Sequence, residues 1–182
     1  MKVLSKKSLF ALAAVSVIAV SSTGYAATMN GTKSSQEATL AMNSKASLHQ
    51  AMNLAKQKVA GDIISAEFDG DNQGEYEVKL IQGNQKYEVK INAATGEIIK
   101  TKQESMDKKD LAEVAAWRQS KIQLNQAISI AQQTTAGQVM GAEFDFKYGK
   151  GIYEMKVAKQ GQKHKLDIDA NTGAVLKNRP SH

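Results

Sequence analysis

The chain has 182 residues, a formal net charge of +6 and no cysteine. The lack of cysteine excludes disulfides and a thiol nucleophile, so burial of apolar side chains must hold the protein together. The positive charge does not indicate a nucleic-acid partner, because lysines and acids are interspersed and the sequence has neither a clustered basic footprint nor a nucleic-acid-binding motif.

Residues 1–26 have the pattern of a secretory signal peptide. Three lysines precede an apolar run over residues 9–20, and Gly24 and Ala26 place small side chains at the −3 and −1 positions. The run is shorter than the roughly 20 residues that a transmembrane helix needs, which favours cleavage after Ala26 over the alternative of an uncleaved anchor. We therefore expect a periplasmic or secreted protein without a stable membrane anchor. The mature charge is then about +3, because three lysines leave with the signal peptide.

Residues 27–44 are rich in Ser, Thr, Asn and Gln and show no apolar period. A segment of this composition buries too little apolar surface to offset the entropy of ordering. We predict a disordered lead-in here.

A first small unit is predicted over residues 45–101, and it opens with a helix. Apolar residues recur at helical spacing over 48–59, after Ser47 and Gln50, whose spacing is that of a capping box. Gly61 follows, and glycine commonly ends a helix in the left-handed conformation.

Three segments of the first unit then alternate between apolar and polar residues, at 64–68, 75–80 and 86–91. Such alternation is typical of strands with one buried and one wet face. A short last strand is predicted after the Thr95-Gly96 turn. Since each element has a single apolar side, the simplest packing lays the helix across one face of a three- to four-stranded antiparallel sheet.

Residues 102–119 form a connector that is predicted to be helical, because Leu111, Val114 and Trp117 have helical spacing. Trp117 is the only tryptophan of the chain. It either packs the connector against the sheets or stands exposed as an aromatic anchor for a partner.

The unit then repeats over residues 120–178. Residues 48–61 match 124–137 at a constant offset of 76, and Ala-Glu-Phe-Asp at 66–69 recurs letter for letter at 142–145. A one-residue insertion raises the offset to 77 for the later strands. The fold class is therefore α+β, with two tandem units of one design.

These residues resemble the PepSY domain. The resemblance rests on the Tyr-Glu-x-Lys strands at 76–79 and 153–156 and on the closing Asn/Asp-Ala-x-Thr-Gly motifs within 91–98 and 168–175. It implies a tandem pair of PepSY domains in an exported bacterial protein. The family occurs in propeptides of thermolysin-like peptidases, where its proposed role is to restrain or inhibit the peptidase. No binding residue carries over individually.

The sequence contains no recognisable catalytic, cofactor or metal site. His49, His164 and His182 lie far apart, and the loop that begins at Asp69 has Leu80 where a calcium loop needs a bidentate glutamate. We therefore expect a protein that is not an enzyme and that has no cofactor.

Two functions remain. One is an exported non-catalytic module that restrains or regulates a peptidase or another envelope or extracellular protein; the other is an envelope stress protein that binds a small ligand or cation without a protein partner. For the first we expect a composite surface, in which Trp117 joins the polar face of the second sheet. The alternative is a merely solvated face. The candidate residues are Trp117, Glu154, Lys156, Lys163 and Lys165.

Overall fold

The computed structural model describes residues 25–71 and 74–181. Nearly all of the predicted signal peptide, residues 1–24, lies outside this range. No described helix is long and apolar enough to span a bilayer.

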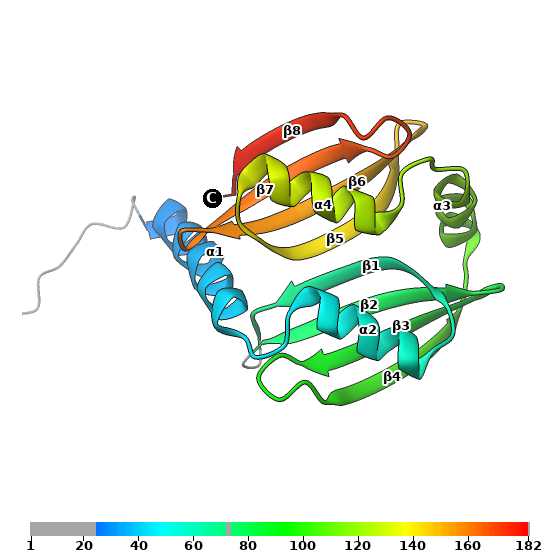
Figure 1. Ribbon diagram of the computed structural model, residues 1–182, viewed down its shortest axis with the longest axis horizontal. Helices are drawn as coiled ribbons and strands as arrows, with labels where there is room; N and C mark the ends of the chain where they lie inside the picture. The colour runs from blue at the N-terminus through cyan, green and yellow to red at the C-terminus, as the bar shows by residue number, and fades with distance from the viewer. Residues whose placement is uncertain (1–24, 72–73, 182) are drawn as a thin grey trace, which may run out of the picture.

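The described residues form four helices and eight strands, and each unit is two helices followed by four strands (Figure 1). The first unit consists of α1 (Tyr25–Asn43), α2 (Leu48–Lys58), β1 (Asp62–Asp69), β2 (Glu75–Gln82), β3 (Gln85–Asn92) and β4 (Ile98–Ser105). The second consists of α3 (Lys108–Arg118), α4 (Leu124–Thr135), β5 (Gln138–Lys147), β6 (Lys150–Lys159), β7 (Gln162–Asp169) and β8 (Val175–Pro180). The predicted α+β class is confirmed.

The two four-stranded sheets join edge to edge into one antiparallel sheet with the order β4-β3-β2-β1-β5-β6-β7-β8. At the seam, Ala66 of β1 lies opposite Ala142 of β5. Ala142 is the repeat equivalent of Ala66, so the seam pairs each strand with its own copy. The units are therefore related by a local two-fold axis through this pair.

One face of the sheet is apolar and carries α2 and α4 (Figure 1). Beneath each helix lies the same edge-to-face aromatic pair, Phe68–Tyr76 with ring centres 5.3 Å apart and Phe144–Tyr153 at 5.5 Å. The opposite face, called the polar face below, displays the charged residues of the strands.

The capping box before α2 forms as predicted, since the Gln50 amide donates to Ser47 Oγ and the Ser47 amide donates to Gln50 Oε1. The role predicted for Gly61 is wrong. Gly61 is not among the residues with positive φ. It is needed because a Cβ there would lie 2.9 Å from the carbonyl oxygen of Ile81.

The predicted disordered lead-in over 27–44 is also wrong, because these residues form most of α1. Ala38 and Ala41 are fully buried, and the Ser34 hydroxyl donates to the carbonyl oxygen of Ser181 at 3.1 Å. The Gln138 amide group donates to the carbonyl oxygen of Ala41 at 3.1 Å. Small buried residues and distant partners order this helix, and a search for local apolar periodicity cannot find either.

The repeat also extends to the helices that precede α2 and α4. At the offset of 76, four residues of 33–45 are identical to their counterparts in 109–121, namely Lys33/Lys109, Glu37/Glu113, Ser44/Ser120 and Lys45/Lys121. Ala38 and Val114 are equivalent and both are buried. The serine hydroxyls make equivalent bonds, Ser44 to the Leu40 carbonyl and Ser120 to the Ala116 carbonyl. The predicted connector helix is thus the second copy of α1.

Candidate functional site

The polar face of the first unit is an array of paired charges. Lys90 lies 2.5 Å from Glu75 and 3.3 Å from Glu77. The hydrogen bond to Glu75 is the main reason that the pKa of Lys90 is raised. Lys86 on β3 binds Asp110 of α3 at 2.8 Å, which ties that helix to the sheet. Acids and bases thus neutralise one another across this half of the face.

Lys156 carries this pairing across the seam, because its Nζ lies 2.9 Å from Glu67 of the first unit. Burial acts to lower the pKa of Lys156, but the charge and hydrogen bond of Glu67 outweigh it and the pKa is raised. Glu143 lies beside this pair, and burial together with the nearby Glu67 charge raises its pKa. Of the predicted candidates, Lys156 is therefore engaged in holding the two units together.

Two further candidates are engaged within the protein. Glu154 pairs with Lys147 at 2.5 Å. Lys163 pairs with Glu37 of α1 at 2.5 Å, and the two side chains are only 13% and 16% exposed. A partner could use Lys163 only after displacing α1.

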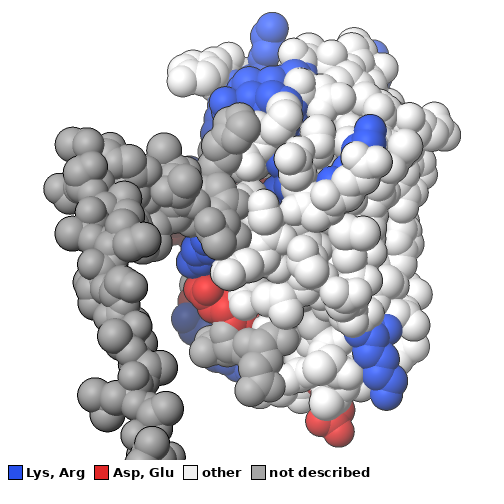
Figure 2. Space-filling view, turned by 90° about the vertical axis from the view of Figure 1, so that its left-hand side faces the viewer, with Lys and Arg blue, Asp and Glu red and all other residues white. Residues whose placement is uncertain are grey.

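Lys165 is exposed and belongs to a row of cations on the polar face. Across the strands it lies opposite Lys156 on one side and opposite Arg179 on the other. The equivalent row of the first unit is Lys79, Glu88 and Lys102, in which the signs alternate. Figure 2 shows Lys and Arg side chains gathered on the upper part of the molecule, which belongs to the second unit.

Directly opposed like charges destabilise a sheet. The second unit places like charges opposite one another where the first unit alternates them. Lys156, Lys165 and Arg179 are called the basic row below. Arg179 is absent from the predicted residues, because the predicted second unit ended at residue 178.

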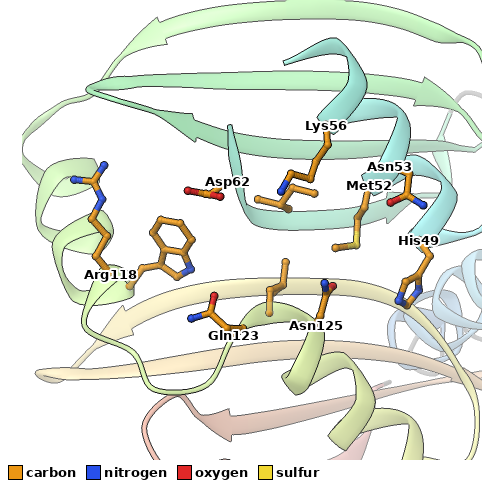
Figure 3. A pocket seen from close by; sticks show the side chains of 11 residues that line it. His49, Met52, Asn53, Lys56, Asp62, Arg118, Gln123 and Asn125 are labelled. Carbon is orange, nitrogen blue, oxygen red and sulfur yellow. The ribbon is translucent and has the colours of Figure 1, made fainter. Parts of the chain in front are cut away.

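Trp117 lies apart from the basic row, so the residues of the predicted composite surface lie in two separate regions. Its half-buried side chain lines a cleft of about 380 Å³ between α2 and α4 (Figure 3). The Tyr153 hydroxyl beneath the start of α4 donates to the Ile122 carbonyl at 2.7 Å. Burial raises the pKa of Tyr153 to about 12. The Trp117 side chain packs against the core while part of it faces the cleft.

A second hollow, of about 820 Å³, lies between α1 and the polar face. Its acids include Glu37, Glu67 and Asp71, which are paired with Lys163, Lys156 and Lys33. The described residues contain no group of three side chains placed to hold a metal ion. The two described histidines do not converge either, since His49 lines the cleft and His164 lies on β7. His182 lies outside the described residues.

The comparisons identify the family. The family model described as "Peptidase propeptide and YPEB domain" matches residues 45–102 and 121–179, and the chain therefore belongs to the PepSY family. No curated protein matches the chain.

Two solved structures are similar. One is a lipoprotein candidate of Clostridium difficile 630, at 26% identity and a TM-score of 0.49, with 80% of this chain and 99% of that chain covered. The other is the YpeB C-terminal domain of Bacillus megaterium, at 17% identity and a TM-score of 0.31, with 77% and 67% covered. Because both TM-scores are below 0.5, the family assignment rests on the two matched regions.

Proposed function

We propose that the chain is an exported, non-catalytic binding module that holds an acidic surface of an envelope or extracellular protein and thereby restrains it. A peptidase is the first candidate partner, because the family is named for peptidase propeptides. The partner in this proposal is a separate chain.

The observation that carries this proposal is the basic row. Changing Glu88 of the first unit into Lys165 of the second replaces an alternating row by three cations, at a cost in stability. An acidic partner offsets that cost only when it is bound. Complementary charge of this kind mainly sets the association rate and the choice of partner.

The test is capture of envelope proteins on the immobilised mature chain, with the double variant Lys165→Glu/Arg179→Glu beside the parent. The matched control is Lys100→Glu/Lys102→Glu on β4, which makes the same charge change at lysines that are 55% and 51% exposed. We expect one protein that the parent and the control retain and the double variant releases. Equal retention by all three refutes the role of the basic row.

Restraint is tested on the captured protein itself. If it is a peptidase, we expect a saturating amount of the chain to slow its cleavage of a fluorogenic peptide, and the double variant to do so only at higher concentration. Unchanged cleavage at saturation refutes restraint while leaving the binding result intact.

Binding of a small ligand without a protein partner is the second candidate, and one observation favours it. This is the cleft that contains Trp117, which lies away from the basic row.

A further inference from the structure

We propose that the cleft between α2 and α4 binds the carboxyl-terminal end of a peptide, with the terminal carboxylate on Lys56 and the last side chain against Trp117. This inference concerns residues other than the basic row and stands independently of the proposed protein partner.

The cleft combines an apolar floor with polar groups at its rim. Met52, Ile63, Leu124 and Trp117 supply apolar surface, and the volume of about 380 Å³ is at the lower end of the range found for small-ligand sites. Figure 3 shows Lys56 and Asp62 on the first-unit side and Gln123 and Asn125 reaching in from the start of α4.

Two of the charged residues that line this cleft, Lys56 and Asp62, are unpaired among the described residues. The ion pairs among the described residues include neither Lys56 nor Asp62. Arg118 lies at the far rim, where its guanidinium donates to the Gly83 carbonyl at 3.2 Å. The cation and the carboxylate that face the cleft are therefore available to a ligand.

The local two-fold axis provides a control within the molecule. The residues equivalent to Trp117, Lys56 and Asp62 are Ala41, Gln132 and Gln138, at the other end of the seam. There the Gln138 amide donates to the Ala41 carbonyl at 3.1 Å and joins α1 to β5. The Asp62 carboxylate has no proton with which to make the equivalent bond to Trp117. The end of the seam at Trp117 thus has two charged residues, Lys56 and Asp62, where the other end has two glutamines.

These groups match the end of a peptide better than other small anions. Lys56 suits a carboxylate, the Asp62 carboxylate suits a donor such as a peptide N–H, and the amides of Gln123 and Asn125 can pair with peptide groups. The apolar floor favours a last residue with an apolar side chain. Peptides with free carboxylates are also what a peptidase releases.

The single tryptophan makes the test direct, since all tryptophan emission comes from the cleft. The mature chain is titrated with acetylated tripeptides that end in Ala, Leu, Phe or Lys, each as the free acid and as the amide. We expect a saturable emission change with Leu or Phe free acids below about 1 mM, and at least about tenfold weaker binding of the amides.

Variants then test whether Lys56 binds the terminal carboxylate of the peptide. Lys56→Gln introduces the residue that α4 has at the equivalent position. It should weaken the binding of the free-acid peptides by about tenfold, to the level of the amides. The matched control is Lys58→Gln, an exposed lysine of the same helix that does not line the cleft, and it should bind like the parent.

The proposal is overturned if no free acid gives a saturable change, if the amides bind equally well, or if Lys56→Gln binds like the parent. Lys165→Glu/Arg179→Glu should leave peptide binding unchanged, so failure here and failure of the protein-partner proposal are distinguishable.

Discussion

Replacing Lys165 by Glu tests whether the second unit keeps its basic row at a cost in stability. In the first unit the same row is Lys79, Glu88 and Lys102, so this substitution creates a charge order that the fold already contains. We therefore expect the variant to be more stable than the parent, although it changes an exposed residue and adds no apolar contact.

The magnitude follows from the two cross-strand contacts of Lys165, with Lys156 and with Arg179. Each changes from like to opposite charge, and such pairs are worth roughly 0.2–1 kcal/mol. Exposed pairs fall near the low end, which gives a gain of about 0.5–1 kcal/mol. For a chain of this size the Tm should rise by about 1–4 °C.

The assay is urea and thermal unfolding of parent and variant at about 0.1 M and about 1 M salt. The stabilisation should shrink at high salt, because the screening length falls from about 10 Å to about 3 Å. Glu88→Lys is the mirror control and should destabilise by a similar amount. A Lys165→Glu variant that is no more stable than the parent at low salt refutes the reasoning.

Three further predictions follow from single contacts. Gly137→Ala should destabilise by about 1–3 kcal/mol in urea unfolding, because its Cβ would lie 2.4 Å from the Ala158 carbonyl oxygen; an unchanged midpoint contradicts this. The hydrogen bond from Lys86 holds the pKa of Asp110 below its usual 3.8. The bond therefore stabilises the folded protein above that pH, and this stabilisation is lost as the pH falls and Asp110 becomes protonated. Asp110→Asn should therefore be destabilised at neutral pH and match the parent in strong acid, and a difference that does not vary with pH contradicts the assignment. Glu37→Gln should speed hydrogen exchange in α1 and leave the sheet protected, whereas unchanged exchange in α1 means that its bond to β7 is not what holds the helix.

The helix and strands of each unit were predictable because their signals are local. The capping pair Ser47 and Gln50, the alternation along the strands and the Thr-Gly turns each act within a few residues. Gly96 and Gly173 have the positive φ that these turns need, at 78° and 74°. The repeat then allowed the elements predicted for the first unit to be assigned to the second.

Residues 27–44 were mispredicted as disordered because the contacts that order them are made with residues far away in the sequence. Ala38 and Ala41 carry little apolar signal, and Glu37 finds its partner on β7. The offset of 76 does pair residues 33–45 with 109–121, so a repeat search carried further towards the N-terminus would have indicated a second helix.

The candidate site was predictable only in part. The divergence of Lys165 from Glu88 pointed to the basic side, but its neighbour Arg179 depends on the strand register. The cleft depends on the pairing of β1 with β5, which brings Lys56 and Asn125 to the same opening. Nothing local in the sequence specifies an edge-to-edge pairing of two repeats.

The most direct measurement of the central claim is the association rate of the purified chain with its captured partner at several salt concentrations. We predict that the parent binds faster as salt falls, whereas Lys165→Glu/Arg179→Glu binds about tenfold or more slowly at low salt and depends little on salt. Lys100→Glu/Lys102→Glu should bind at the parent rate. Equal association rates for all three proteins at every salt concentration contradict the claim that the basic row recognises the partner.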